Sequence, residues 1–423
     1  MSAANVDLNV DVNVDYADSL SWDGRIPARL RWLQEHAPVY WAEKSNCFVL
    51  TKYEDVVAVS KDQDLFTSGE GVRPGPNAPK IGLIDEAEPR HSHLRRLINK
   101  GFTPRMVKLW EEKFRAITKE TLDAVAQKGE CDFVDDIAAP LPILLIAEMI
   151  GIPREKQKEF HQWSDAMMAG EGNQDKPEII AKSAAAFLAY STLVKEIAEQ
   201  RRREPKDDLI SILVTADDEG ILGRFELQKQ SVEGLETDEH LANATNELVM
   251  LSVILMVAGN ETTRNAIAGG MQALIENPEQ RDKLLADPSL LPGACEEIVR
   301  YVSPVNSFSR IATRDTELRG VPIKQGQQVL MVYKAANRDP DQFLDPHRFD
   351  VTRNPVHVGF GIGNHFCLGA NLARMELRVA FEELLRRFPD MRYAGKGPVL
   401  RPSALVRSCV EMKVKFTPER AAA

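Results

Sequence analysis

Apolar residues recur at helical spacing along most of the chain after about residue 54. The longest apolar run, Leu248 to Gly259, contains one serine and is shorter than the roughly 20 residues that a membrane span needs. We therefore predict a buried helix that begins at about Asp238, a suitable N-cap, and ends near Glu276, before an Asn-Pro pair. A second buried helix is predicted from Leu141, because LPILLIAEMIGIP follows a proline and stops at Gly-Ile-Pro.

Short alternating segments predict small β-sheets beside these helices. VYW at Val39 and FVLT at Phe48 flank a turn-like stretch, which favours a hairpin. Residues 316–333, TELRGVPIKQGQQVLMVY, alternate around two glycines in the same way. Between and after these segments, helices are predicted through CEEIVRY and from about Leu368 to Phe388.

The chain shows no internal repeat and no low-complexity linker. The predicted fold class is therefore mainly α, with one large helical domain over residues 19–423 and small β-sheets at its edges. Residues 1–18 form a polar leader that we expect to be flexible. Residues 168–175 and 216–237 are predicted loops, and the second is unusually long for a connection inside a compact domain.

The composition is typical of a globular chain with a sizeable core, because 43% of the residues are hydrophobic and 27% are charged. A net charge of -10 argues against general nucleic-acid binding. The N-terminal residues lack the pattern of a signal peptide or membrane anchor, so we expect a cytoplasmic protein, and a monomer by default. The 5 cysteines are scattered and form no C-x-x-C pair, which argues against a disulfide framework.

A glycine-rich loop, GFGIGNHFCLG, places Cys367 just before the last amphipathic helix. Backbone N–H groups and the positive end of a helix dipole stabilise a thiolate, which is a metal ligand. Gly361, Gly363 and Gly369 allow tight turns and the close approach of a flat cofactor. Taken alone, Cys367 is as well explained as a small buried hydrophobe, and the usual spacing of a four-ligand zinc site is missing.

The complete pattern of Phe360, Gly361, His365, Cys367 and Gly369 resembles the haem-binding loop of the cytochrome P450 family. The resemblance extends from about Trp32 to Val414 and implies a large, mainly helical domain that binds haem b. Cys367 would be the axial thiolate ligand, which favours O–O cleavage at the iron.

The segment AGNETT in the long buried helix resembles the oxygen-activation motif of the same family. By helical spacing Ala258, Glu261 and Thr262 share one face with Leu251 and Ile254. Within this motif, Gly259 leaves room for dioxygen beside the backbone. The resemblance implies that the acid and the alcohol relay protons to bound dioxygen. Without it, a threonine hydroxyl bonded one turn back and an acid that ends the apolar stretch would explain both residues.

Two further sets of residues match the family pattern. Glu297 and Arg300 resemble the E-x-x-R pair, which in the family joins a downstream arginine, here Arg348, in a buried structural network. As an ordinary surface pair, Glu297 and Arg300 would contribute only about 0.3 kcal/mol. The residues that resemble the family's haem propionate donors are His91, Arg95, Arg310 and His365.

The resemblance implies a monooxygenase that hydroxylates an unactivated C–H bond with O2 and two electrons. No flavin or iron-sulfur motif is present, so a separate ferredoxin and ferredoxin reductase are implied. The basic stretch from Arg90 to Lys108 is either a solvated face or a docking site for an acidic electron carrier.

Three segments resemble the bacterial branch that oxidises sterol side chains and methyl-branched lipids: MVAGNETTRNAIAGG, ECDFVDDIAAPLPILLIAEMIGIP and HVGFGIGNHFCLGANLARMEL. The resemblance implies a bulky hydrophobic substrate. The residues expected to line its pocket are all apolar, although each is equally consistent with plain core: Ile84, Ile254, Val305, Phe308 and Val406. Alternatives are a terpene, fatty-acid or alkane hydroxylase, a peroxide-driven peroxygenase, and a haem sensor without turnover.

Overall fold

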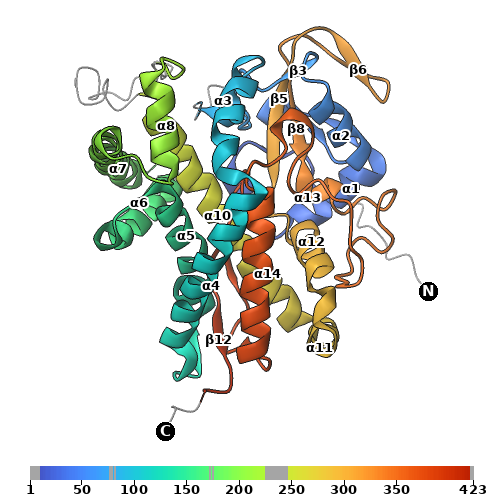
Figure 1. The fold of residues 1–423 in the computed structure, drawn as a ribbon. Coiled ribbons are helices and arrows are strands. Elements are labelled where there is room, and N and C mark those ends of the chain that lie inside the picture. The colour runs from blue at the N-terminus through green and yellow to red at the C-terminus, as the bar shows by residue number, and fades with distance from the viewer. Residues whose placement is uncertain are drawn as a thin grey trace.

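The computed structural model describes residues 10–75, 80, 82–170, 173, 176–223 and 246–419. Helices dominate this part of the chain, as the apolar spacing predicted (Figure 1). The helices are α1 Ile26–His36, α2 Tyr53–Lys61, α3 Arg90–Ile98, α4 Pro104–Ala126, α5 Pro140–Ile150, α6 Gln157–Gly170, α7 Pro177–Arg203, α8 Leu209–Asp218, α10 Glu247–Glu276, α11 Pro278–Ala286, α12 Leu291–Val302, α13 Tyr333–Ala336 and α14 Ala370–Arg387.

The strands form small sheets at the edges of the helical body. In the largest described sheet the strand order is β1-β2-β8-β5-β3, and the other pairings are β4-β12-β9, β6-β7 and β10-β11. The strands are β1 Val39–Ala42, β2 Cys47–Leu50, β3 Phe66–Thr67, β4 Glu130–Asp132, β5 Ser307–Ala312, β6 Thr316–Leu318, β7 Val321–Ile323, β8 Gln328–Val332, β9 Arg392–Tyr393, β10 Val399–Arg401, β11 Ser408–Glu411 and β12 Lys413–Lys415.

The predicted short elements are confirmed. β1 and β2 pair antiparallel with Val39 opposite Leu50, which is the expected hairpin. β6, β7 and β8 follow the alternation in residues 316–333, and both turn glycines, Gly320 and Gly326, have positive φ angles of 78° and 82°. A side chain at these positions would be strained, so glycine is what makes the turns possible.

Helix α10 crosses the centre of the molecule behind α14, and α14 runs side by side with α4 (Figure 1). α10 packs on α5, α12 and α14, which explains why its sequence is apolar on all sides. A Cβ atom added at Gly270 would lie 2.6 Å from Cζ of Phe381 in α14, so the two helices approach closely because this residue has no side chain.

The predicted start of this helix was too early. α10 begins at Glu247, and the side chain of Asn246 accepts a hydrogen bond of 2.8 Å from the Leu248 amide as its N-cap. Residues 224–245 lie outside the described residues. They include Asp238 and most of the predicted long loop, 216–237. The two predicted loops, 168–175 and 216–237, also begin later than expected, because α6 continues to Gly170 and α8 continues to Asp218.

Part of the predicted polar leader, residues 10–18, packs against the domain. Tyr16 is fully buried in a cluster with the core side of β2 and β8. Its amide donates to the hydroxyl of Ser45, and the Trp22 indole donates to its carbonyl oxygen. The polar composition concealed this one large apolar anchor, which holds the segment against the domain.

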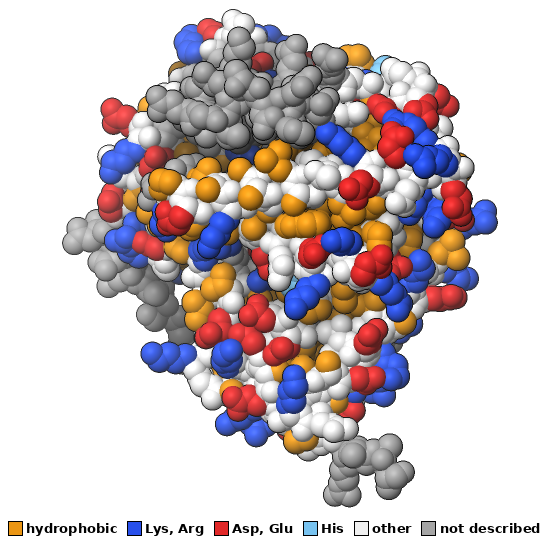
Figure 2. Space-filling model, turned by 90° about the vertical axis from the view of Figure 1, so that its left-hand side faces the viewer, with side chains coloured by type: hydrophobic (Ala, Val, Ile, Leu, Met, Phe, Trp, Pro, Cys, Tyr) orange, Lys and Arg blue, Asp and Glu red, His pale blue; other side chains and the backbone are white. Residues whose placement is uncertain are grey.

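The face that carries α6 and α7 shows acidic, basic and apolar side chains interspersed (Figure 2). Among the described residues of this face, the charges of both signs are mixed (Figure 2), so none of its visible area favours a strongly charged partner of one sign. Within the described residues, no helix is both long enough and apolar enough to cross a membrane.

Candidate functional site

The loop before α14 holds Cys367 through backbone contacts. The Cys367 amide donates to the Phe360 carbonyl at 2.8 Å, so the loop folds back on itself. Gly361 and Gly363 have positive φ angles of 68° and 75°, and a Cβ at Gly363 would lie 2.6 Å from the backbone oxygen of Ser60. The pattern of glycines thus serves a tight turn and a close approach to α2, as their type predicted.

The Cys367 side chain is accessible, although protein atoms crowd around its sulfur. This burial raises the pKa of the thiol, while a hydrogen bond from the Gly369 backbone and the charges of Arg95 and Arg374 lower it. The net direction is upward. The helix end does supply the predicted N–H donor, but on its own it does not favour the thiolate.

The predicted basic residues gather beside this loop from three elements. The ring of His91, in α3, stacks on the ring of His365 with 3.9 Å between centroids. Nε2 of His365 lies 3.0 Å from the Ser68 hydroxyl. Arg310, in β5, is almost wholly buried, and its Nε finds no hydrogen-bond acceptor in the described chain. The side chain of Arg95 likewise forms no hydrogen bond or ion pair with a described residue.

These groups strongly influence one another. Burial first, and then the charges of Arg310, His91 and Arg95, lower the pKa of His365 to about 2. Burial also lowers the pKa of Arg310. The cluster therefore consists of buried and half-buried donors, with the acid Glu88 at 3.2 Å from Nδ1 of His91, an arrangement suited to a ligand that carries carboxylates.

The acid and the alcohol in α10 point to different surroundings. Ala258 is exposed and Thr262 is partly exposed, although most of their helix is buried. The Thr262 hydroxyl donates to the Ala258 carbonyl at 2.8 Å, one turn back. Glu261 is buried and its carboxylate accepts from Asn265 at 3.0 Å. Glu261 therefore stands next to Ala258 and Thr262 by helical position, as predicted, but its side chain turns toward Asn265.

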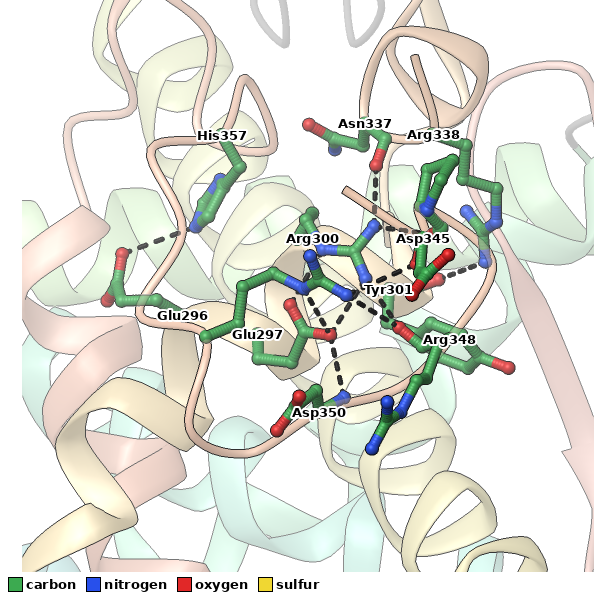
Figure 3. A network of polar contacts seen from close by, with 12 residues as sticks. Glu296, Glu297, Arg300, Tyr301, Asn337, Arg338, Asp345, Arg348, Asp350 and His357 are labelled. Atoms are coloured by element: carbon green, nitrogen blue, oxygen red, sulfur yellow. Dashed lines mark hydrogen bonds and ion pairs between the residues drawn. The ribbon is translucent and has the colours of Figure 1, made fainter. Parts of the chain in front are cut away.

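The E-x-x-R pair lies in a buried network (Figure 3). Nε and Nη2 of Arg300 each donate to Glu297 at 2.7 Å, and neither side chain is exposed. Nη1 of Arg300 donates to the backbone oxygens of Asn337 and Pro346 at 2.8 Å. The pair therefore ties α12 to the chain that leads to the cysteine loop, in a setting far from a solvated surface pair.

The arginine predicted to complete this network was the wrong one. Arg348 contributes only its backbone oxygen, which accepts from Arg300 at 3.2 Å, and its guanidinium points away from Glu297 (Figure 3). The guanidinium beside Glu297 belongs to Arg353, with Nε 3.3 Å from Oε1. The turn formed by residues 350–353 brings Arg353 inward, which spacing along the sequence did not reveal.

A second ion pair supports the cysteine loop. We did not predict this pair from the sequence. Arg374, in α14, donates to both oxygens of Glu296 at 2.7 and 2.9 Å, and its guanidinium lies 4.7 Å from the ring centroid of Phe360. Nε2 of His357 lies 3.2 Å from the same carboxylate. Arg374 lies in the second turn of α14, the helix that follows Cys367, and this position could have identified it.

The expected substrate-pocket residues fall in different parts of the core. Val305 and Val406 pair in an isolated β-bridge. Phe308 packs edge-on against Tyr333 with 6.0 Å between ring centroids. Ile84 and Ile254 belong to the main helical core, so the five positions stay a predicted lining.

A hollow of about 420 Å³ opens between α4, α12 and α14. Its lining includes cationic side chains and the two acids that pair with some of them: Lys108, Arg374, Arg378, Glu111 and Glu296.

Comparison with known proteins matches residues 26–392 to the family model for cytochrome P450. A steroid C26-monooxygenase of Mycobacterium tuberculosis is 37% identical over 410 residues, covering 96% of this chain and 98% of the relative. A methyl-branched lipid omega-hydroxylase of the same species is 38% identical over 358 residues, covering 81% and 78%. The crystal structure of CYP109E1 from Bacillus megaterium with testosterone superposes with a TM-score of 0.78, at 32% identity and coverage of 92% and 96%.

Proposed function

Because this chain belongs to the cytochrome P450 family and is a monooxygenase, we propose that it hydroxylates a C–H bond of a sterol or methyl-branched lipid. The observation that carries the choice of substrate is the match over nearly the whole length to relatives named for these substrates. The predicted lining of the pocket is apolar at all five positions, which fits a bulky hydrophobic molecule.

The family binds haem, and the residues near Cys367 fit that group. Nε of the buried Arg310 has no acceptor among the described residues, and the half-buried Arg95 side chain forms no ion pair with any of those residues. With His91 and His365 beside them, these cations fit two propionates. Cys367, an exposed residue in the loop before α14, is the candidate axial ligand, and bound haem would supply activation of dioxygen there.

The residues of the chain would then control protons and position. We assign Thr262 to hold a hydrogen bond beside the reacting oxygen and Glu261 to supply protons to Thr262. The Glu297–Arg300–Arg353 network has a structural role, because it fixes the chain that leads to Cys367.

Electrons would come from a ferredoxin and its reductase. Four basic residues from α3 to α4 are exposed and form no ion pair with a described residue: Arg96, Lys100, Arg105 and Lys108. Unpaired surface cations attract an acidic carrier and increase its rate of encounter. Lys108 and Arg374 both line the hollow between α4, α12 and α14, and Arg374 interacts electrostatically with Cys367. A carrier that docks on Lys108 would therefore lie near Cys367.

The test begins with a reduced, carbon monoxide-bound difference spectrum of the wild type and Cys367→Ser. A strongly red-shifted Soret band that is lost in the variant is expected, since only a thiolate ligand produces it. Titration with sterols, methyl-branched lipids, terpenoids and straight-chain fatty acids follows, and a sterol or a methyl-branched lipid should give the largest low-to-high spin shift. Terpenoids or straight-chain fatty acids that shift the spin state instead would contradict the proposed substrate.

Thr262→Ala should consume NADPH without matching product when reconstituted with a surrogate ferredoxin and reductase. The ratio of product to NADPH should fall about tenfold or more, because the hydroxyl that positions the proton is lost. Thr262→Ser keeps a hydroxyl and should retain most of the coupling. Efficient turnover of the wild type with hydrogen peroxide and no carrier would favour the peroxygenase alternative.

A further inference from the structure

The acid of the oxygen-activation motif is turned away from its alcohol. The hydroxyl of Thr262 is bonded to the Ala258 carbonyl, whereas the carboxylate of Glu261 is bonded to Nδ2 of Asn265. Oδ1 of Asn265 accepts from the Cys409 amide at 2.8 Å, so this amide side chain is itself fixed against β11. Glu261 must therefore rotate before it can serve Thr262.

One guanidinium lies between Glu261 and the surface. Nη1 of Arg264 donates to Oδ1 of Asp165, in α6, at 3.0 Å, and lies 3.8 Å from Oε2 of Glu261. The same nitrogen thus serves both carboxylates, and the surface acid has the shorter contact. The side chain of Asp165 is 48% exposed and that of Glu261 is 5% exposed. Arg264 therefore connects an acid at the surface with an acid in the interior.

The charge of Arg264 is shared among several nearby acids. Its Nε is buried and finds no acceptor among the described residues. Asp135, in the π-helical turn Val134–Ala138, is a third acid near it, and burial and the charge of Asp132 raise its pKa while Arg264 lowers it. Nε2 of His161 lies 3.4 Å from the far oxygen of Asp165. Several acids therefore compete for one partly satisfied cation.

We propose that Arg264 is a positioning residue for Glu261. Asp165 competes with Glu261 for the Arg264 guanidinium, and this competition leaves Glu261 free to turn toward Thr262. The inference rests on the proposed role of Glu261 and Thr262 in proton supply. Loss of the Asp165 charge would let Arg264 close on Glu261 and hold it away from the alcohol. Loss of the Arg264 charge would remove this competition altogether.

The activity test compares variants in the reconstituted enzyme with cholesterol as the probe. Asp165→Asn should lower kcat about fivefold with little change in KM and should increase the solvent isotope effect, because fewer molecules hold the acid toward Thr262 and proton supply becomes rate-limiting. In an Arg264→Gln background the same substitution should have no effect. Asp123→Asn is the matched control, since Asp123 is 45% exposed and also pairs with an arginine.

A second measurement needs no turnover. A double-mutant cycle with Glu261→Gln and Arg264→Gln, followed by urea unfolding of the holoprotein, gives the coupling of this pair. Expressed as a ratio of unfolding constants, the coupling should rise at least threefold in the Asp165→Asn background. Arg264→Lys provides a milder replacement if the glutamine variant does not fold.

The outcomes distinguish failure of this inference from failure of the proposed substrate. An equal loss of kcat with and without Arg264, or a coupling that Asp165→Asn leaves unchanged, would overturn the inference. A wild type that binds haem but forms no product from cholesterol would instead count against the proposed substrate, and the unfolding cycle would still decide the role of Asp165.

Discussion

At the scale of single residues, burial governs several ionisable groups more strongly than their partners do. Glu376, in α14, is buried between α14 and α10, and the hydroxyl of Thr263 lies 3.3 Å from its Oε2. Burial raises the pKa of Glu376 to about 8, and this one hydrogen bond lowers it only in part. At neutral pH the folded protein therefore holds a protonated acid, whereas the unfolded chain releases the proton near the ordinary value.

This difference predicts a pH-dependent stability. The contribution of neutral Glu376 is complete below about pH 4.5 and is lost progressively as the pH rises toward 8, because the unfolded chain ionises first. Glu376→Gln cannot ionise, so its stability relative to the wild type should increase by more than about 1 kcal/mol between pH 5 and pH 8. Urea unfolding across this range measures the effect, and parallel curves for the two proteins would contradict it.

At the scale of elements, the connection from α13 to α14 has almost no regular structure, yet its backbone is held at defined points. The amide of Asp350 donates to Glu297 at 3.0 Å, and the guanidinium of Arg353 bonds to the backbone oxygens of Leu344 and Asp345. Buried charge on α12 therefore organises a loop that the backbone alone would leave open.

The two arginines of this connection should differ sharply when replaced. Arg353→Met should destabilise the fold by about 3 kcal/mol, because it leaves Glu297 with less compensation in a fully buried position. Arg348→Met should change stability by less than about 0.5 kcal/mol, because that side chain is exposed and only its backbone takes part. Urea midpoints compare them, and equal losses would show that Arg348 matters through its side chain after all.

At the scale of the whole molecule, net charge and local charge have opposite signs. The chain carries a net charge of -10, which repels an acidic partner at long range. The exposed cations from α3 to α4 give one region the opposite sign. Docking of an acidic ferredoxin should therefore depend on that region and on the salt concentration.

Arg105→Gln and Lys108→Gln should each raise the KM for ferredoxin about threefold at low salt and leave kcat little changed, because they act on encounter. The difference from the wild type should shrink at high salt, where screening removes the attraction. Lys396→Gln, an exposed cation between β9 and β10, is the control. A KM that is insensitive to salt in all of these proteins would argue against electrostatic docking.

The sequence alone determined features whose signals are local. Glycine and proline mark the end of α5, alternating residues mark the β1-β2 hairpin, and the loop around Cys367 is identified by its glycines and its neighbours. These features depend on backbone conformations that particular residue types allow or forbid, so a short stretch is enough to predict them.

Only the tertiary structure decided which distant groups meet. Arg353 replaces Arg348 beside Glu297, Tyr16 anchors a segment of polar composition, and Glu261 turns toward Arg264 and α6. In each case the favoured position depends on burial and on a partner far away in the chain. Periodicity gives the face on which a side chain starts, whereas packing and charge compensation decide where it ends.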